Sequence, residues 1–287
     1  MNYVVTGATG PFGRHVIETL LARGVAAADV VAVGRSVDKI SDLAERGVQV
    51  RAASYDDPEA LRTALEGAGT VLLVSGSEVG QRVQQHQNVI DAAVAVGAGR
   101  IVYTSLVNAR EAGLQLAAEH VATEQALAGS GLAHTVLRNG WYLENYTDQI
   151  GNYVANGAVL GSAGEGRISA ATRADLAEAA ATVLLDESHT GKVYELGMDD
   201  AFTLAELAEA VSVASGTAVT YRDLPGEEFQ QALVGAGLPE SFATVLADTD
   251  RGIRDGALHT DTGDLARLLG RPATSMPEAV RAALVAS

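Results

Sequence analysis

Three glycines near the N-terminus have the spacing that phosphate binding requires. The run Val4-Val5-Thr6 is followed by glycines at positions 7, 10 and 13, and a helical pattern begins directly after the turn. In such a strand–turn–helix unit the first glycine permits a tight turn, the second lets the backbone approach a pyrophosphate, and the third allows close packing of helix on strand. The start of the helix also favours phosphate through its N–H groups and dipole. The pattern predicts a dinucleotide site formed by Gly7, Ala8, Thr9, Gly10, Pro11, Phe12 and Gly13.

The end of the second predicted strand indicates which dinucleotide fits. A carboxylate at this place binds the ribose 2′-OH of NAD, whereas an arginine accommodates the 2′-phosphate of NADP. The sequence is Val33-Gly34-Arg35-Ser36, with no acidic residue before Asp38. Because a guanidinium can form two hydrogen bonds to phosphate oxygens, Arg35 favours NADP(H); the alternative is an ordinary surface arginine. A P-loop for nucleoside triphosphates is excluded because no Gly-Lys-Ser/Thr follows the glycines.

Most other catalytic machinery is absent from the chain. Short-chain dehydrogenases commonly use a Tyr with a Lys four residues later, but neither of the only lysines, Lys39 and Lys192, follows a tyrosine at that spacing. The 6 histidines include no pair four residues apart, and there are 0 cysteines, so no metal site is expected. A Gly-x-Ser-x-Gly nucleophile motif is also missing. These absences favour a reaction in which a reduced nicotinamide supplies a hydride while the protein binds, orients and polarises.

Short β-branched runs alternate with helical patterns through the first half of the chain. Most runs are continuously apolar, as expected for parallel strands covered on both faces. Ser75 and Gly76 follow the fourth run, and because ligands of such sheets bind at the carboxyl edge, we expect both to border the cofactor. The alternation predicts an α/β fold with a doubly wound parallel (Rossmann) sheet. The runs are residues 3–5, 30–33, 48–50, 71–74, 100–103 and 134–137.

After about residue 139 the pattern becomes rich in glycine and then mostly helical. We therefore predict an NADP-binding Rossmann domain over residues 1–138 and a smaller, mostly helical substrate-side lobe over residues 139–287, parts of which can return to the sheet. Thr203-Leu204-Ala205-Glu206 has the form of a capping box. Helices are predicted at 173–186, 203–215, 225–236, 239–250 and 277–285, and short strands at 192–196 and 219–221.

Composition excludes several classes of function. The chain has 287 residues, with 20 Lys and Arg against 36 Asp and Glu, and a formal net charge of -16. Such a charge repels nucleic acid, so no nucleic-acid partner is expected. No apolar run approaches the ~20 residues that span a bilayer, and the N-terminus lacks the features of a signal peptide. We expect a cytoplasmic protein without membrane insertion; an oligomer is compatible with the sequence.

Several segments together resemble one known family. The most specific is the Asn-Gly-Trp-Tyr run that follows the sixth predicted strand. The chain resembles the type 2 bacterial NADPH:quinone oxidoreductases, a group within the NmrA-like branch of the atypical short-chain dehydrogenases, which also contains triphenylmethane reductase. The segments that carry the resemblance are residues 6–13, 77–82, 103–106, 119–124, 137–146, 171–175 and 191–196.

The resemblance implies a flavin-independent reduction of quinones or similar planar conjugated acceptors, with direct hydride transfer from NADPH. It implies that Asn139, Trp141 and Tyr142 lie beside the nicotinamide. His120 would donate a hydrogen bond or a proton to a quinone oxygen. Besides residues 7–13, the implied cofactor contacts are Arg35, Ser75, Gly76, Arg138, Asn139, Gly140, Trp141, Tyr142 and Arg173.

Other interpretations stay open. A nucleotide-sensing regulator of the NmrA type would bind NADP(H) and a protein partner without turnover, and the missing Tyr-Lys pair suits it equally well. Reduction of cationic dyes is a third candidate, whereas a sugar-nucleotide epimerase is disfavoured because it needs the Tyr-Lys pair. Core packing is the alternative role for Trp141, and a solvated helix position is the alternative for His120. Gln81, Gln84, Gln85 and His86 are predicted to form a solvated helix face.

Overall fold

Two structural units, both discontinuous along the chain, make up the computed structural model, which describes residues 2–286. The first contains the chain up to Ser105 together with Glu119–Arg138 and Arg173–Tyr194. The second contains Leu106–Ala118, Asn139–Thr172 and the chain from Glu195 onward. The domain boundary that the sequence analysis places after residue 138 stays a prediction.

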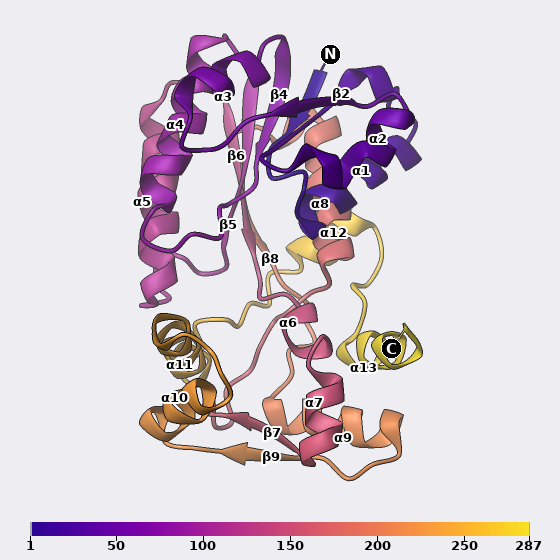
Figure 1. Ribbon diagram of the computed structural model, residues 1–287, viewed down its shortest axis with the longest axis vertical. Helices are drawn as coiled ribbons and strands as arrows, with labels where there is room; N and C mark the ends of the chain where they lie inside the picture. The colour runs from indigo at the N-terminus through magenta and orange to yellow at the C-terminus, as the bar shows by residue number, and fades with distance from the viewer. Residues whose placement is uncertain (1, 287) are drawn as a thin grey trace. The chain divides into compact units, whose positions relative to one another are not determined.

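Seven strands form one sheet in the order β3-β2-β1-β4-β5-β6-β8 (Figure 1). The ladders β1–β2, β1–β4, β2–β3 and β4–β5 are parallel, which confirms the predicted doubly wound α/β fold. Because β1 pairs with both β2 and β4, the winding direction reverses there, and ligands of such sheets bind at this switch point. The strands are β1 Asn2–Val5, β2 Val30–Gly34, β3 Gln49–Ala52, β4 Ala68–Leu73, β5 Arg100–Leu106, β6 His134–Asn139 and β8 Val193–Leu196.

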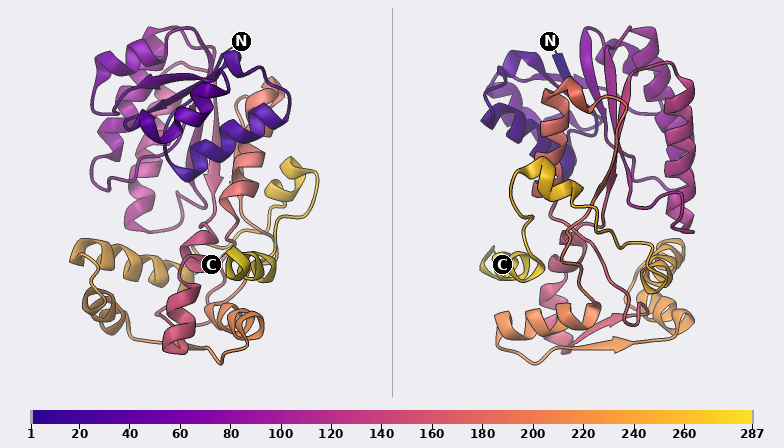
Figure 2. Two further views of the ribbon diagram at one scale, coloured as in Figure 1. Left: turned by 45° about the vertical axis from the view of Figure 1, so that its right-hand side comes forward. Right: turned by 180° about the vertical axis from the view of Figure 1, so that it is seen from behind.

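Helices cover both faces of this sheet. In Figures 1 and 2, α3, α4 and α5 lie on one face, and α1, α2 and α8 lie on the other, where α1 packs along α8. These helices are α1 Pro11–Ala22, α2 Ser41–Glu45, α3 Pro58–Ala64, α4 Arg82–Ala95, α5 Gln115–Gly129 and α8 Arg173–Leu185, with 3-10 turns η1 Ala27–Asp29, η2 Val37–Ile40 and η3 Glu187–His189.

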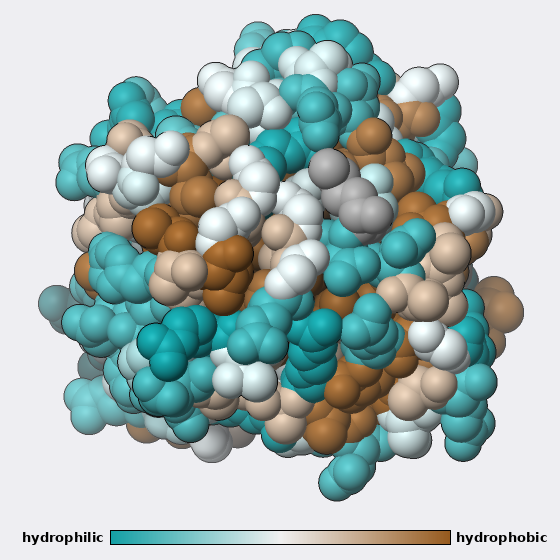
Figure 3. Space-filling view, turned by 90° about the horizontal axis from the view of Figure 1, so that it is seen from above, coloured by the Kyte–Doolittle hydropathy of each residue, from teal (hydrophilic) through white to brown (hydrophobic). Residues whose placement is uncertain are grey.

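The burial of the strands explains their composition. Every residue of β2 and β5 is buried, as expected for strands covered by helices on two sides, whereas no residue of the edge strand β3 is fully buried. Val4, Val71 and Ile101, from three adjacent strands, belong to one apolar cluster with side chains of α3 and α4. On the end face in Figure 3, hydrophilic residues alternate with separate apolar patches.

The second unit is mostly helical and contains a parallel two-stranded ladder, β7–β9. Helix α9 packs against α7, α13 and both strands of this ladder. Thr203 caps α9 through the predicted capping box with Glu206. Among residues 2–286, none of the helices combines the length and hydropathy that crossing a bilayer requires. The elements are α6 Glu144–Thr147, α7 Ile150–Asn156, β7 Ala158–Gly161, α9 Leu204–Ser215, β9 Thr220–Asp223, α10 Gly226–Gly235, α11 Glu240–Arg254, α12 Asp264–Leu269 and α13 Met276–Ala286.

A buried carboxyl group links α11 to this ladder. Asp250 is 9% exposed, and its Oδ2 accepts a hydrogen bond from the Ser162 N–H at 2.7 Å. Burial raises the pKa of Asp250 from 3.8 to about 6, and the nearby carboxylate of Asp223 acts in the same direction. The neutral form is therefore favoured in the folded state, so the resulting stability is full below pH 3.8 and is lost as pH rises through about 6.

The substitution Asp250→Asn is expected to remove this pH dependence, because the amide oxygen still accepts from Ser162 but does not titrate. A shift of about two pKa units corresponds to about 3 kcal/mol, so the stability of the variant relative to the wild type should rise by up to that amount between pH 4 and 7. Urea unfolding at a series of pH values measures it. Asp255→Asn, at the exposed end of the same helix, is the control for loss of one charge. A difference between wild type and Asp250→Asn that stays constant over this range would contradict the account.

Candidate functional site

The turn between β1 and α1 depends on two glycines in close surroundings. Gly7 has a φ of +61°, and a Cβ there would lie 3.1 Å from Val74 Cβ. A Cβ at Gly13 would lie 2.5 Å from the Gly7 carbonyl oxygen and 2.9 Å from Ala8 Cα. The contact at Gly13 is too short for a side chain, and at Gly7 the left-handed φ together with a tight contact favours glycine. The helix therefore begins directly against the end of the strand.

The first turn of α1 offers backbone rather than side chains to a ligand. Gly10 is the N-cap, no side chain caps the turn, and Pro11 is the first helical residue. A helix N-terminus of this kind carries a partial positive charge and can bind phosphate. Ala8 and Phe12 are buried below the turn. The predicted site residues at positions 7–13 are therefore brought together in one turn with the features of an anion-binding backbone.

Gly34 brings the end of β2 against the same turn. A Cβ at Gly34 would lie 2.7 Å from Cγ2 of the Thr9 side chain, and the Ala8 N–H donates to the Val33 carbonyl at 3.0 Å. The next residue, Arg35, has a side chain that is 61% exposed, and its Nη1 lies 2.6 Å from Glu78 Oε1. The structure thus places an accessible guanidinium beside the glycine turn, where the sequence predicts contact with a 2′-phosphate.

The chain after β4 is held in place by hydrogen bonds to its backbone. The Ser75 N–H donates to Thr104 Oγ1 at 2.9 Å, and the Gly76 N–H donates to His86 Nε2 at 2.9 Å. The Gly76 carbonyl accepts from Arg82 Nε at 2.6 Å. Ser75 and Gly76 therefore stand in a fixed segment at the carboxyl edge of the sheet, next in the strand order to the glycine turn.

Gln85 and His86 are buried, so the predicted solvated helix face is wrong for these two residues. Their exposed fractions are 4% and 0%. Because His86 Nε2 accepts from Gly76, the ring proton is on Nδ1, which lies 2.9 Å from Thr123 Oγ1. Burial lowers the pKa of His86 to about 4, which keeps the ring neutral and able to accept. Gln85 Nε2 donates to Asp56 Oδ1 and to Glu78 Oε2, each at 3.1 Å.

Tyr55 supports the glycine turn from the loop after β3. Its hydroxyl donates to the Val74 carbonyl at 2.8 Å and also contacts Thr6 Oγ1. Burial raises the pKa of the Tyr55 hydroxyl, so the phenol stays protonated and remains a donor. The hydroxyl would also lie 3.7 Å from a Cβ at Gly7. Tyr55 therefore fixes the ends of β1 and β4 relative to each other.

His120 occupies the interior of the first unit. It is 7% exposed, and its Nδ1 lies 2.7 Å from the Tyr103 hydroxyl. Burial lowers the pKa of His120 to about 3, and the positive charge of Arg82 contributes. At neutral pH the ring is therefore uncharged, which leaves hydrogen bonding rather than proton donation from an imidazolium as the chemistry open to it. Its predicted role toward the acceptor stays a prediction.

Arg138 forms a buried ion pair. Its Nε and Nη2 donate to the two carboxylate oxygens of Glu124 at 2.9 and 2.8 Å, and Ser105 Oγ donates to the same carboxylate at 2.7 Å. All three residues are at most 8% exposed. A bidentate pair of this kind fixes the planes of both groups, so it secures the carboxyl ends of β5 and β6. The cofactor contact predicted for Arg138 stays a prediction.

The Asn-Gly-Trp-Tyr segment belongs to the second unit and is anchored there by its backbone. The Asn139 carbonyl accepts from the Val107 N–H at 2.9 Å, and the Gly140 N–H donates to Leu196 at 2.7 Å. The Trp141 carbonyl accepts from Ala171 at 2.9 Å. A Cβ at Gly140 would lie 2.4 Å from the Ser169 carbonyl oxygen, so glycine is required. Trp141 and Tyr142 are half-buried.

Asn139 is the residue of this segment with unused hydrogen-bonding capacity. The residue is 4% exposed, and neither its Oδ1 nor its Nδ2 has a hydrogen-bond partner within the described residues. An unpaired buried amide costs about 1–3 kcal/mol, and native structures rarely retain one without a reason. The contact with the nicotinamide predicted for Asn139 stays a prediction.

Arg173, also predicted to contact cofactor, is the half-buried first residue of α8 in the first unit. Four polar residues at the same sheet edge were missed by the sequence analysis: Tyr55, Asp56, Glu78 and Gln85. The rule applied to Ser75 and Gly76, that residues directly after a parallel strand border a ligand, would have found Tyr55 and Asp56 after β3. For Gln85, a helix position read as solvated, no comparable signal exists.

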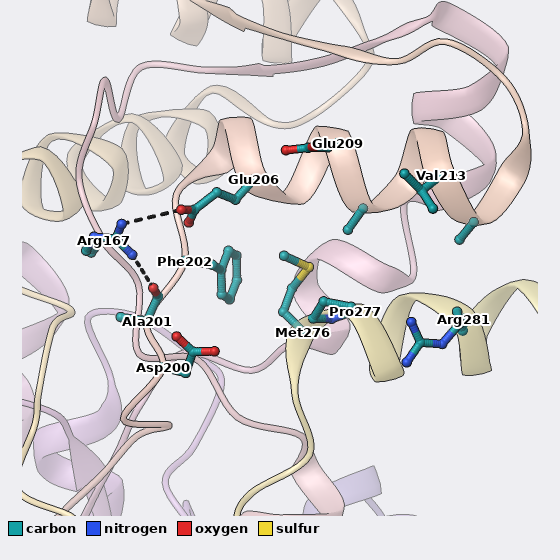
Figure 4. A pocket seen from close by; sticks show the side chains of 12 residues that line it. Arg167, Asp200, Ala201, Phe202, Glu206, Glu209, Val213, Met276, Pro277 and Arg281 are labelled. Carbon is teal, nitrogen blue, oxygen red and sulfur yellow. Dashed lines mark hydrogen bonds and ion pairs between the residues drawn. The ribbon is translucent and has the colours of Figure 1, made fainter.

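A separate cavity of about 760 Å³ lies in the second unit, between α9 and α13 (Figure 4). Phe202 and Met276 are apolar residues of its lining. Arg167 Nη2 donates a hydrogen bond to Glu206 Oε1 at 3.3 Å. None of the predicted site residues lines it. Among the described residues, no group of histidine and carboxylate side chains is arranged to hold a metal ion.

Comparison with known proteins gives three informative matches. The model of the NmrA-like family matches residues 2–257. Quinone oxidoreductase 2 of Escherichia coli is 48% identical over 276 residues, which cover 96% of each chain. A crystal structure of the E. coli NADPH-dependent quinone oxidoreductase QOR2 complexed with NADPH superposes with a TM-score of 0.95 at 46% identity, covering 98% of this chain and 99% of that one.

The similarity extends to a second kind of reductase. The Citrobacter sp. triphenylmethane reductase complexed with NADP(H) has a TM-score of 0.92 at 37% identity, covering 99% of this chain and 100% of that one. Both structures therefore share this fold over nearly their whole length.

The substitution Gly13→Ala tests the close contact at the glycine turn. The added methyl group would meet the Gly7 carbonyl, which backbone hydrogen bonds hold in place, so we expect a loss of about 3 kcal/mol in the free energy of unfolding. Guanidinium unfolding measures the loss. Gly129→Ala is the matched control, because a Cβ at Gly129, in the same unit, meets nothing within 4 Å. Equal stability of the two variants would show that the contact is not tight.

Proposed function

Because the chain belongs to the NmrA-like family, we propose that it catalyses the NADPH-dependent, flavin-independent reduction of quinones or similar conjugated acceptors. The observation that carries the proposal is the 48% identity with E. coli quinone oxidoreductase 2 over 96% of both chains. The glycine turn and the accessible guanidinium of Arg35 support it independently, since both are features that bind a phosphorylated dinucleotide.

The residues present fit NADPH. The turn has glycine at positions 7, 10 and 13, and no side chain caps the N-terminus of α1, so its backbone N–H groups can face a pyrophosphate. The N-terminus of α1 would hold the pyrophosphate, and Arg35 the 2′-phosphate. Ser75 and Gly76 would border the cofactor through their fixed backbone. When bound, NADPH supplies two electrons as a hydride.

The protein's own contribution to the reaction is hydrogen bonding and positioning. Negative charge develops on the oxygen of a quinone as it is reduced and is spread through its ring, so fixed donors can stabilise the transition state without a strong acid. We assign this role to the unpartnered amide of Asn139 and, as hydrogen-bond donor only, to neutral His120. Trp141 and Tyr142 would offer flat surfaces to a planar acceptor. Arg138, paired with Glu124, would orient the end of β6.

Reduction of cationic dyes is a second candidate. The 37% identity with a triphenylmethane reductase and the net charge of -16 favour it, because an acidic protein attracts a cationic substrate. Dyes and quinones are both planar conjugated electrophiles, so one site can serve both.

A turnover assay tests the proposed activity. Purified protein mixed with NADPH and 1,4-benzoquinone should consume the reduced nicotinamide faster than the protein-free mixture, as followed by absorbance. NADPH deuterated on one face of C4 should give a primary isotope effect, and the other stereoisomer should not. Tight NADPH binding without oxidation in the presence of any quinone would instead favour the nucleotide-sensing regulator.

The substitution Asn139→Ala tests the assigned donor. Loss of one preorganised donor to a developing oxyanion typically lowers kcat about 100-fold. Because the amide has no partner among the described residues, its removal breaks no hydrogen bond and relieves the cost of burying it unpaired, so the free energy of unfolding should not fall by more than about 1 kcal/mol. Asn152→Ala, on the exposed surface of α7, is the matched control. Unchanged kcat in Asn139→Ala would remove Asn139 from the mechanism.

A further inference from the structure

The guanidinium assigned to the 2′-phosphate already has an anionic partner. Arg35 Nη1 lies 2.6 Å from Glu78 Oε1, with the two side chains 61% and 33% exposed. Arg35 follows β2 and Glu78 follows β4, and these two strands flank β1 in the sheet. The ion pair therefore connects the two strand ends on either side of the strand that leads into the glycine turn.

Glu78 is held in this position from its other side. Its Oε2 accepts a hydrogen bond at 3.1 Å from Nε2 of Gln85, a residue that is 4% exposed. The segment around it is also fixed, since the Gly80 N–H donates to Glu119 Oε1 at 3.0 Å and Arg82 holds the Gly76 carbonyl at 2.6 Å. The carboxylate of Glu78 is therefore a built feature of the sheet edge and not a chance surface contact.

A carboxylate at this place acts differently on the two nicotinamide dinucleotides. A 2′-phosphate must share Arg35 with Glu78 or displace it, and the two anions repel each other. The 2′-OH of NAD(H) can donate a hydrogen bond to the Glu78 carboxylate, as it does to the carboxylate at the end of the second strand in NAD-binding sheets of this type. Glu78 thus opposes the selectivity that Arg35 provides.

Resting on the proposed function, we propose that Glu78 sets the cofactor selectivity of this protein by competing with the 2′-phosphate for Arg35. Arg35 alone would give a strong preference for NADP(H). With Glu78 beside it, the preference is moderated, and NAD(H) remains a usable cofactor. The opposite hypothesis is that Glu78 serves to pre-position Arg35 for phosphate; it predicts a change of the opposite sign.

Calorimetric titration with NADP⁺ and NAD⁺ distinguishes these two hypotheses on the role of Glu78. The measured quantity is the ratio of the Kd for NAD⁺ to the Kd for NADP⁺ in the wild type and in Glu78→Gln, which keeps the size of the side chain and one of its two acceptor oxygens but removes the charge. Exposed ion pairs contribute up to about 1 kcal/mol, so we expect the ratio to rise about fivefold. Glu66→Gln is the charge-matched control, because Glu66 is exposed and precedes β4, at the opposite edge of the sheet.

The same substitution in an Arg35→Ala background tests the competition itself. In the Arg35→Ala background, Glu78→Gln should change the ratio of Kd values by less than half as much as it does in the wild-type background. An equal effect in both backgrounds, or a ratio that is unchanged or lowered in Glu78→Gln, would overturn the proposal. If the wild type binds NADP⁺ but the ratio of Kd values does not change as expected, only the selectivity proposal is wrong. If it binds neither nucleotide, the proposed function falls with it.

Discussion

The contact between Gly13 and the Gly7 carbonyl is the constraint on which the candidate site depends. A Cβ at Gly13 would lie 2.5 Å from that oxygen, so the absence of a side chain lets the start of α1 lie against the end of β1. This directs the N-terminus of the helix outward at the edge where the sheet reverses its winding. Gly34 extends the same constraint to β2, because its contact with Thr9 brings Arg35 beside the turn. A cationic side chain and a helix dipole thereby converge in a protein of net charge -16.

Buried polar groups keep this edge rigid, and their protonation states suit the task. His86 is neutral because burial lowers its pKa to about 4, and a neutral ring can accept the Gly76 N–H. Glu124 and Arg138 satisfy each other through a bidentate pair. Asn139 differs from all of these, since its amide has no partner among the described residues. The paired groups position the edge, and the amide of Asn139 stays a predicted ligand contact.

Local pattern was sufficient for the strands of the sheet and the longer helices of the second unit, but not for α6, α7, β7 and α12, and it was insufficient for the polar network. Continuous apolar runs predicted the first six strands of the sheet, and the capping box at Thr203 marked the start of α9, because both signals depend on neighbours in sequence. Gln85 and His86 were misassigned because their partners, Glu78 and Gly76, lie in a loop whose path is set by tertiary packing. The pairing of Arg35 with Glu78, 43 residues apart, likewise has no local signal.

Hydrogen–deuterium exchange with and without NADPH tests the central claim most directly, because bound phosphate protects the backbone N–H groups that it contacts. The account predicts protection concentrated in residues 7–14, with smaller changes at residues 34–36 and 74–80. Saturating NADPH that leaves exchange in residues 7–14 unchanged would contradict it.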